Sequence, residues 1–439
     1  MTVSLERETF EEGETIILQG NVGDDFFIIE TGEVGVFKTD DDGKEKKVAK
    51  LESGAYFGEK ALLSEDVRQA SCIAESRVVC LTLGRADFIE MVGTVDEIIS
   101  KDTIKPVEEV VAPEPSPPSP PAKSKHAMEM GISDLEIKST LGIGAFGQVK
   151  LCKYAAEDKY FALKCQSKQA IQENGLEEHV LNEVDVMSKI DHPLIARLYA
   201  TLQDSRYIYF VLELLQGGEL FTHLRKNVKF PEQAGRFYAA SVISAFACLH
   251  SKRIAYRDLK PENLVMDDRG YVKLVDFGLA KVLAGGKTWT LCGTPDYLAP
   301  EIILNEGHDL AVDYWALGVL IFEMIVGSPP FFADDPMEVY EKILAANPAM
   351  PTFFSKNLSD LVKKLLRSQQ GKRLGNTRGG TSDVIKHKWF SSFDWQALER
   401  GDLPSPFKPT VQNKDDISNF EAFEDQPVPP ESEWSPKLL

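Results

Sequence analysis

The chain has 439 residues, 43% of them hydrophobic and 27% charged, and this composition excludes a wholly disordered, collagenous or disulfide-stapled protein. Its 49 basic and 68 acidic side chains give a formal net charge of −19. Such an acidic chain repels phosphate backbones, so we expect no nucleic-acid polymer among its partners and favour basic peptides instead.

The six cysteines and the apolar stretches indicate a cytoplasmic protein. No two cysteines stand in Cys-x-x-Cys spacing, so we expect free thiols in a reducing compartment. The first residues show neither a signal peptide nor a myristoylation pattern. The most apolar stretch, residues 315–326, contains Glu323 and is too short to span a bilayer, which predicts a buried helix and no transmembrane segment.

Three compositional zones divide the chain. Residues 10–91 hold short strand-like runs punctuated by glycines, which predicts a small β-barrel or sandwich. Seven prolines fall within residues 106–121, which predicts an extended linker. Its two Ser-Pro pairs, at Ser116 and Ser119, fit a plain spacer better than phosphorylation sites. From about residue 135 the pattern changes to strands followed by long apolar-periodic helices.

A glycine-rich stretch opens the large C-terminal zone. Gly142, Gly144 and Gly147 have G-x-G-x-x-G spacing, which dinucleotide-binding folds share. Here the glycines stand between two strand-like runs, residues 135–141 and 148–154, whereas a dinucleotide fold would continue into a helix. We therefore predict a hairpin whose backbone N–H groups lie over a triphosphate.

Lys164 and Glu183 form a second candidate pair. Lys164 lies on a strand-like run and Glu183 on a helical pattern. An ion pair between them would hold the lysine against two phosphates. Taken alone, they fit two unrelated surface charges better, because most charged side chains are solvated.

The segment YRDLKPEN, residues 256–263, carries the most specific chemistry. Asp258 can accept a hydroxyl proton or orient the hydroxyl for in-line attack, and Lys260 can reach the transferring phosphate. Asn263 and Asp276 are hard oxygen ligands of the kind that Mg²⁺ requires. Positioning and charge neutralisation are what phosphoryl transfer needs most, and these side chains supply both.

In this order, and with Ala299-Pro300-Glu301, the motifs resemble the protein-kinase signature. The family usually has histidine at the position of Tyr256. The tyrosine makes this motif resemble that of the AGC group of Ser/Thr kinases. The resemblance implies a bilobal kinase fold over residues 135–390, with an antiparallel β N-lobe and a mostly α C-lobe, and an AGC-type tail over residues 391–439. It implies ATP and Mg²⁺ as cofactors, with catalytic Asp258, Lys260, Lys164 and Glu183 and the metal ligands Asn263 and Asp276.

The same resemblance implies an ATP pocket in which backbone groups of Glu213 and Leu215 face the adenine edge. The tail segment SNFEAF would wrap back over this pocket, the alternative being a disordered acidic tail. The implied ATP-binding residues are Leu141, Gly142, Ile143, Gly144, Ala145, Phe146, Gly147, Gln148, Val149, Ala162, Lys164, Leu212, Glu213, Leu215, Val265, Val275 and Phe420.

Substrate choice also follows from the resemblance. Three acids match positions that bind arginines upstream of the acceptor, and three apolar residues match the pocket for the residue after it. They are Glu219, Glu262 and Glu323, and Leu291, Pro295 and Leu298. We therefore expect basic protein or peptide substrates of the form Arg/Lys-Arg/Lys-x-Ser/Thr-apolar.

The segment KTWTLCGTPDYLAPE resembles the activation segment of cyclic-nucleotide-dependent kinases. Thr290 is the implied activating phosphosite. Its implied basic partners are Arg257, Lys281 and His179. Cys292 is expected to be a packed thiol rather than a redox sensor.

The front zone resembles a cyclic-nucleotide-binding domain with a small β-barrel or jelly-roll fold, which we place at residues 1–105, followed by a linker at 106–134. Arg68 can pair with the cyclic phosphate, and Glu59 can accept from the ribose 2′-hydroxyl. The anion site is completed by Gly58, Ala61 and Leu62.

Ser71 matches the hydroxyl that meets the guanine amino group in cGMP-selective domains. One neutral hydrogen bond is worth about 0.5–1.5 kcal/mol, so Ser71 favours cGMP without excluding cAMP. The alternative is a degenerate barrel that no longer binds a nucleotide.

Together the two parts resemble the cGMP-dependent protein kinases, which implies a multidomain α+β Ser/Thr kinase with cGMP as its allosteric ligand. The chain departs from that family in having one nucleotide domain, no coiled coil and no R-R-x-[AGS] pseudosubstrate, so we expect a truncated or minimal form with an unidentified brake. The alternatives are a constitutively active or cAMP-responsive kinase whose front domain is vestigial or a tether, and a non-catalytic nucleotide-binding scaffold.

Overall fold

The computed structural model divides the chain into two compact units, residues 1–114 and 115–439. The division falls inside the predicted linker. The residues that the structure describes are 6–19, 21, 25–39, 45–51, 55–57, 70–84, 128, 130–144, 147–283, 286–290, 292–421, 423 and 426–437.

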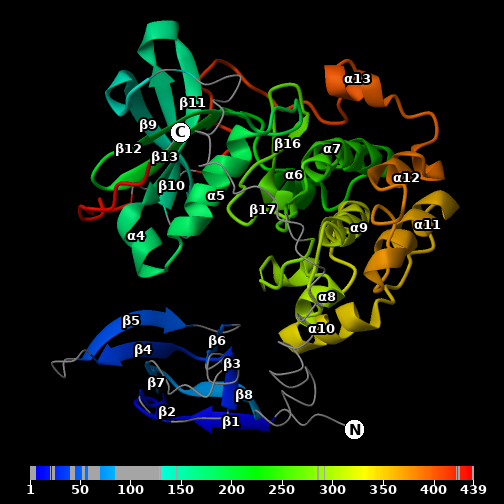
Figure 1. Cartoon of the computed structure of the whole chain (residues 1–439). Coiled ribbons are helices and arrows are strands. Elements are labelled where there is room, and N and C mark those ends of the chain that lie inside the picture. The colour runs from blue at the N-terminus through cyan, green and yellow to red at the C-terminus, as the bar shows by residue number, and fades with distance from the viewer. Residues whose placement is uncertain are drawn as a thin grey trace, which may run out of the picture. The chain divides into compact units, whose positions relative to one another are not determined.

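The N-terminal unit is a sandwich of two antiparallel sheets, with the strand orders β1-β8-β3-β6 and β2-β7-β4-β5 (Figure 1). Phe27, Ile29 and Val34 are among the side chains that fill its core. This confirms the expected small jelly-roll-like β domain. Its strands are β1 (Glu6–Phe10), β2 (Thr15–Ile17), β3 (Asp25–Thr31), β4 (Val34–Thr39), β5 (Glu45–Leu51), β6 (Tyr56–Phe57), β7 (Ser71–Ala74) and β8 (Val78–Gly84).

The C-terminal unit begins with a small lobe built on an antiparallel sheet of order β12-β13-β11-β10-β9. β9 and β10 form the predicted glycine hairpin. A Cβ at Gly147 would lie 1.9 Å from the carbonyl oxygen of Cys165, so glycine is needed where β10 begins. The elements are β9 (Leu135–Gly144), β10 (Gly147–Tyr154), β11 (Lys159–Ser167), α4 (Lys168–Glu173), α5 (Glu177–Ser188), β12 (Leu198–Gln203) and β13 (Tyr207–Glu213).

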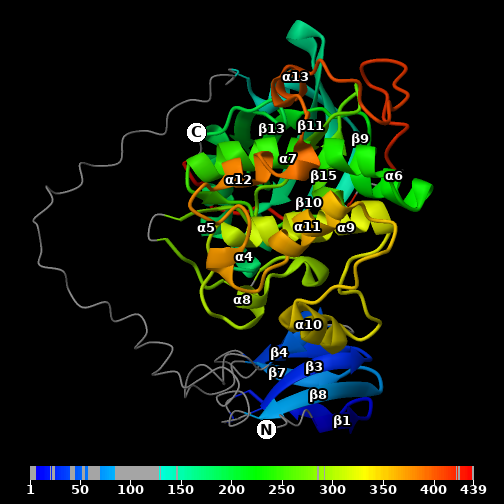
Figure 2. The ribbon, with the colours of Figure 1, turned by 90° about the vertical axis from the view of Figure 1, so that its right-hand side faces the viewer.

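A larger, mostly helical lobe follows (Figure 2). Its centre is the contact between α7 and α9, and α9 is the buried helix that the apolar run 315–326 predicts. Gly327, with φ of 100°, ends α9. The helices are α6 (Leu220–Asn227), α7 (Glu232–Ser251), α8 (Pro300–Ile303), α9 (Ala311–Val326), α10 (Pro336–Ala345), α11 (Lys356–Leu365), α12 (Thr381–Ile385) and α13 (Trp395–Arg400). It also contains two short two-stranded sheets, β14 (Ile254–Ala255) with β17 (Lys281–Val282) and β15 (Leu264–Met266) with β16 (Val272–Leu274).

The C-terminal tail, red in Figure 1, returns to the small lobe. The Ser432 backbone N–H donates to the Ser205 carbonyl at 2.7 Å, and Arg206 pairs with Glu431 at 2.9 Å. Residues 429–432 of the tail therefore contact the loop between β12 and β13.

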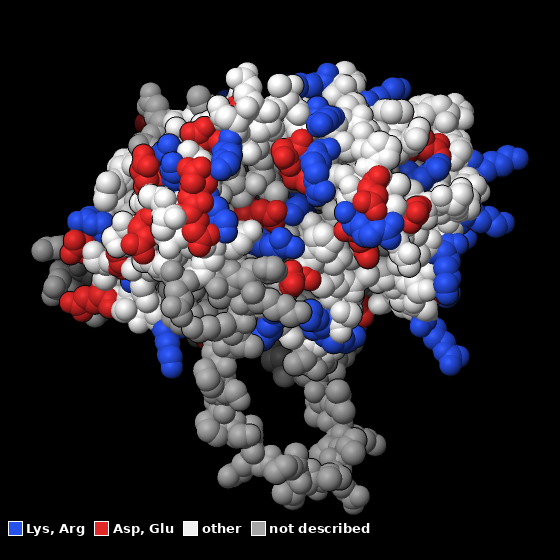
Figure 3. All heavy atoms as spheres, turned by 90° about the horizontal axis from the view of Figure 1, so that it is seen from above, with Lys and Arg blue, Asp and Glu red and all other residues white. Residues whose placement is uncertain are grey.

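Charges of both signs are interspersed over the face seen in Figure 3, and the net acidity is not gathered there into one patch. Among the described residues, no helix combines the length and apolarity needed to cross a membrane.

Candidate active site

A cavity of about 570 Å³ is lined by residues of both lobes of the C-terminal unit. Its lining brings together every described residue of the predicted ATP site; Ala145 and Phe146 lie outside the described residues. Phe420 of the tail also lines it. The lining includes the predicted polar residues Lys164, Glu183, Glu219, Asp258, Glu262, Asn263 and Asp276.

Lys164 lies at the centre of the charges in this cavity. It projects from β11, and its Nζ lies 2.7 Å from Glu183 Oε1 on α5 and 2.9 Å from Asp276 Oδ1. Burial opposes the charge on Lys164, but the two carboxylates together raise its pKa above the ordinary value. The ammonium in turn lowers the pKa of Asp276, so both remain ionised at neutral pH. The surface-charge alternative does not hold, because Glu183 is only 2% exposed.

A second polar cluster surrounds Asp258, which lines the same cavity. Its Oδ2 lies 3.1 Å from Lys260 Nζ and accepts from Asn263 Nδ2 at 2.8 Å. The hydroxyl of Thr294 donates to Asp258 Oδ1 at 3.2 Å and accepts from Lys260 Nζ at 3.1 Å. A carboxylate held on both oxygens is oriented before any substrate arrives.

The loop that carries Asp258 is fixed from inside the large lobe. The carboxylate of Asp313, buried on α9, accepts the backbone N–H groups of Tyr256 and Arg257 at 2.9 and 2.8 Å. The Tyr256 hydroxyl donates to the Val275 carbonyl at 2.5 Å, which joins this loop to the Asp276 segment. Arg257 and Asp276 have φ of 68° and 55°, a strained region for residues other than glycine, and both positions adjoin or enter the cavity.

Residues 135–390, more than half of the chain, match the family described as protein kinase domain. The chain belongs to the protein kinase family. Residues 7–94 match the cyclic nucleotide-binding domain family.

The chain is similar over nearly its whole length to three curated relatives, all of them cGMP-dependent protein kinases. The cGMP-dependent protein kinase isozyme 1 of Drosophila melanogaster is 44% identical over 435 residues, 95% of this chain and 56% of the relative. The fruit-fly isozyme 2 forms cD5/T2 are 42% identical over 97% of this chain and 45% of the relative. The human cGMP-dependent protein kinase 2 is 40% identical over 99% of this chain and 60% of the relative. The chain thus spans about half the length of the curated relatives it matches.

In the segment that the sequence predicts to be the activation segment, Thr290 is exposed. Thr288, two residues earlier, is buried and forms an isolated antiparallel β-bridge with His308. The Thr288 hydroxyl accepts a hydrogen bond from Lys281 Nζ at 3.0 Å. Nη1 of Arg257 is buried and has no hydrogen-bond partner among the described residues. His179 is exposed on α5 and lines the nucleotide cavity. Burial raises the pKa of the half-buried Cys292 thiol, which disfavours the reactive thiolate.

The three acids assigned to substrate lie in different surroundings. Glu219 and Glu262 line the nucleotide cavity, and burial with the neighbouring Glu262 and Glu421 raises the pKa of Glu219. Glu323 is only 3% exposed and already accepts from the Tyr297 hydroxyl at 2.5 Å and from Arg225 at 3.4 Å. An arginine of a substrate would have to share Glu323 with Arg225.

The apolar residues assigned to the position after the acceptor are only partly described. Leu298 is buried beside Asp258 in a small pocket. Pro295 is exposed, and Leu291 lies outside the described residues.

In the N-terminal unit, Gly58, Glu59, Ala61, Leu62 and Arg68 lie outside the described residues. Ser71 is described at the start of β7 and is 3% exposed. Its hydroxyl accepts from the Gln19 backbone N–H at 3.0 Å. One lone pair of the Ser71 hydroxyl oxygen is therefore already used as an acceptor. A guanine amino group would have to donate its hydrogen bond to the other lone pair.

Thr294 and Asp313 carry parts of the site that the sequence reasoning missed. Neither stands at a fixed short distance from Asp258 along the chain, and tertiary folding brings each to the catalytic loop. The only signal was weak: Asp313 is an acid at the start of a strongly apolar run, where burial demands partners.

Proposed function

We propose that this chain is a Ser/Thr protein kinase that transfers the γ-phosphate of ATP to basic protein or peptide substrates and is activated by cyclic nucleotide. The observation that carries the proposal is Lys164, bonded to both Glu183 and Asp276 beside a cavity that also contains Asp258. This is the charge arrangement that phosphoryl transfer requires.

Each side chain has a role in the proposed reaction. Lys164, held by Glu183, binds phosphate oxygens. Asp258 orients the acceptor hydroxyl and accepts its proton, while Lys260 and Thr294 keep the carboxylate in place. Lys260 also neutralises charge that develops on the transferred group.

Asn263 and Asp276 are the residues we propose to hold Mg²⁺. The Asn263 Nδ2 donates to Asp258, which leaves its Oδ1 as the ligand atom. Among the described residues no three His, Cys, Asp or Glu side chains form a metal cage of their own. Two oxygen ligands together with substrate phosphates suit Mg²⁺, which would supply charge neutralisation at those phosphates.

The assignment of basic substrates rests on Glu219, Glu262 and Glu323. The raised pKa of Glu219 reflects a carboxylate that is crowded by other acids, and an arginine would relieve that repulsion. We expect Glu219 and Glu262 to contribute more than Glu323, because Glu323 already has two partners.

We propose cGMP as the preferred activator, with Arg68 and Glu59 holding the cyclic phosphate and ribose. Support comes from the match of residues 7–94 to cyclic nucleotide-binding domains and from relatives named as cGMP-dependent kinases. The domain bounds that we propose are 1–105 for the nucleotide-binding domain, 106–134 for the linker, 135–390 for the kinase domain and 391–439 for the tail. We also propose a cytoplasmic setting, which the six free cysteines support.

The test is a peptide kinase assay on the purified 439-residue chain, with an Arg-Arg-x-Ser peptide, titrated first with cGMP and then with cAMP. We expect activation at a lower concentration of cGMP than of cAMP, and loss of activity in Asp276→Ala. Tenfold activation needs only about 1.4 kcal/mol of differential binding. High activity that neither nucleotide changes would favour a vestigial or tethering front domain. Full activity in Asp276→Ala would refute the metal assignment, and no activity at all would favour a scaffold.

Thr290 is proposed as the activating phosphosite, because this exposed threonine follows Thr288, which is bridged to His308. The charge of Arg257 acts on His308, and Nη1 of Arg257 has no hydrogen-bond partner among the described residues. A charge-assisted hydrogen bond is worth about 1.5–3 kcal/mol, so we expect Thr290→Val to lower kcat/KM by roughly 10- to 100-fold. Phosphatase treatment should reduce wild-type activity equally and leave the variant unchanged. A phosphatase-insensitive wild type would refute the assignment.

A further inference from the structure

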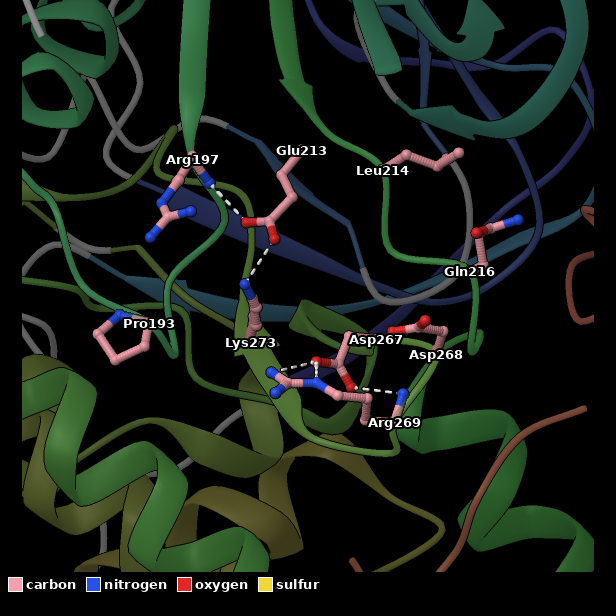
Figure 4. A pocket seen from close by; sticks show the side chains of 9 residues that line it. All are labelled: Pro193, Arg197, Glu213, Leu214, Gln216, Asp267, Asp268, Arg269 and Lys273. Atoms are coloured by element: carbon pink, nitrogen blue, oxygen red, sulfur yellow. Dashed lines mark hydrogen bonds and ion pairs between the residues drawn. The ribbon is translucent and has the colours of Figure 1, made fainter. Parts of the chain in front are cut away.

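A second cavity, of about 280 Å³, lies against the segment that joins the two lobes (Figure 4). Unlike the nucleotide cavity it is lined mainly by charged side chains, among them Arg197, Glu213 and Lys273. Glu213 lines both cavities, and its two successors Leu214 and Leu215 line the nucleotide cavity. A side chain anchored in the charged cavity can therefore position the backbone of the adenine-binding segment.

Glu213 is held at three points. Its backbone N–H donates to the Arg197 carbonyl at 2.9 Å. Its carboxylate accepts from the Arg197 backbone N–H at 3.3 Å and from Lys273 Nζ at 2.6 Å. Figure 4 shows the Glu213 and Lys273 side chains pointing toward each other.

Lys273 is a firm anchor because β16 pairs with β15 on one side and bonds to residues 194–196 on the other. Its side chain is only 7% exposed, against 20% for Glu213. The neighbouring Leu274 donates its N–H to the Leu194 carbonyl at 3.0 Å and accepts from the Ala196 N–H at 2.9 Å. Asp276 lies two residues beyond Leu274, the last residue of β16. The Lys273 ammonium thus links the adenine-binding segment to the segment that carries a proposed metal ligand.

We infer that Lys273 and Glu213 form a positioning pair that holds the adenine-binding backbone in place and so sets nucleotide affinity and base selectivity. The inference rests on the proposed ATP-dependent function. Removal of Lys273 leaves the largely buried carboxylate of Glu213 without its cation. The free energy of this unpaired charge is lower in water, so the carboxylate moves toward solvent. The backbone of Glu213 and Leu215 then moves with it, whereas Lys164, Asp258 and Asn263 are fixed by other contacts.

Three measurements on full-length Lys273→Met test the pair: ADP affinity, peptide-kinase kinetics and the preference for ATP over GTP. ADP affinity, measured by calorimetry, should fall about tenfold, and in the peptide assay KM for ATP should rise similarly while kcat and peptide KM stay within about twofold. The preference for ATP over GTP should also decrease, because adenine and guanine present different hydrogen-bonding edges to the backbone. Lys273→Arg, which keeps the charge, should restore most of the affinity. Lys364→Met is the matched control, since Lys364 forms an exposed pair with Asp360 at 2.7 Å on α11.

Unchanged ADP affinity and base preference in a folded Lys273→Met would overturn the inference. So would a parallel loss of kcat and peptide binding, which indicates general damage. If that variant does not fold, Glu213→Gln with Lys273→Met removes both charges, and the same loss of ADP affinity is expected. Because ADP binding does not depend on turnover, a wild type that binds ADP without phosphorylating peptide would refute the proposed function alone.

Discussion

The buried carboxylate of Glu183 helps to keep the side chain of Lys164 protonated. It is 2% exposed and its burial raises its own pKa, yet its charge is retained against Lys164 at 2.7 Å. With Asp276 it keeps Lys164 protonated inside the cavity. A buried ion pair of this kind contributes orientation more than stability.

Glu183→Gln should therefore reduce activity more than stability. Lys164 would then be held by Asp276 alone and displaced from its phosphate-binding position. Loss of one charged hydrogen bond predicts a fall in kcat/KM of roughly 10- to 100-fold in the peptide assay. Glu178→Gln, an exposed position on the same helix, is the control and should be neutral. Equal activity of the two variants would contradict the assigned role.

His308 is a second buried titratable residue and should affect stability with pH. Desolvation lowers its pKa to about 4, helped by Arg257 and Lys281 and opposed by Asp313 and Asp309. The unfolded chain therefore binds a proton near pH 6.5 that the folded chain does not. Stability is lost as pH falls from about 6.5 toward 4.

At pH 5 this single group should cost about 2 kcal/mol relative to pH 7.5. The measurement is denaturant unfolding of wild type and His308→Asn at both pH values. The variant should lose about 2 kcal/mol less on acidification. If both proteins lose the same amount, His308 is not a neutral buried group.

At the scale of elements, the large lobe depends on one buried ion pair between distant segments. Arg373 is fully buried and its guanidinium donates to both carboxylate oxygens of Glu301, at 2.6 and 2.8 Å. It also donates to the Ala311 carbonyl at 3.0 Å. The pair therefore ties α8, next to the activation segment, to the start of α9 and to the loop after α11.

Arg373→Met should lower the free energy of unfolding by about 3–5 kcal/mol, because Glu301 becomes an unpaired buried charge. Denaturant unfolding of the C-terminal unit measures it. Glu301→Gln added to Arg373→Met should recover part of the loss. Arg400→Met, which breaks an exposed pair with Asp402, should change little. A loss below about 1 kcal/mol for Arg373→Met would contradict the argument.

At the scale of the whole molecule, two compact units have separate cores. Separate cores predict separate ligand effects on stability. A ligand at 100 times its Kd stabilises the state that binds it by about 2.7 kcal/mol. Calorimetry should show that cGMP raises one melting transition and ADP raises the other.

Arg68→Ala should remove the effect of cGMP and leave that of ADP. The peptide assay is a further check, because the variant should also lose cGMP activation. If cGMP shifts neither transition in wild type, the front unit does not bind it. A shift that persists in Arg68→Ala would show that the ligand is held by other residues.

The sequence alone determined the coarse order of the large unit, strands first and long helices after them, and most of the proposed chemistry. The glycine hairpin, the strand that carries Lys164, the helix that carries Glu183 and the buried helix α9 are local patterns, and the structure has each of them. The motif around Asp258 was recognisable because its residues lie within one short segment. Periodicity and short motifs depend only on neighbours along the chain, so they can be read without coordinates.

Only the tertiary structure decided which distant charges meet. Thr294 and Asp313 reach the Asp258 loop across tens of residues, and Glu323 is shared with Arg225 and Tyr297. The pair of Glu213 and Lys273 joins two strands that no motif connects. These contacts arise because a buried charge must find a partner wherever packing brings one, and packing depends on the whole fold rather than on sequence spacing.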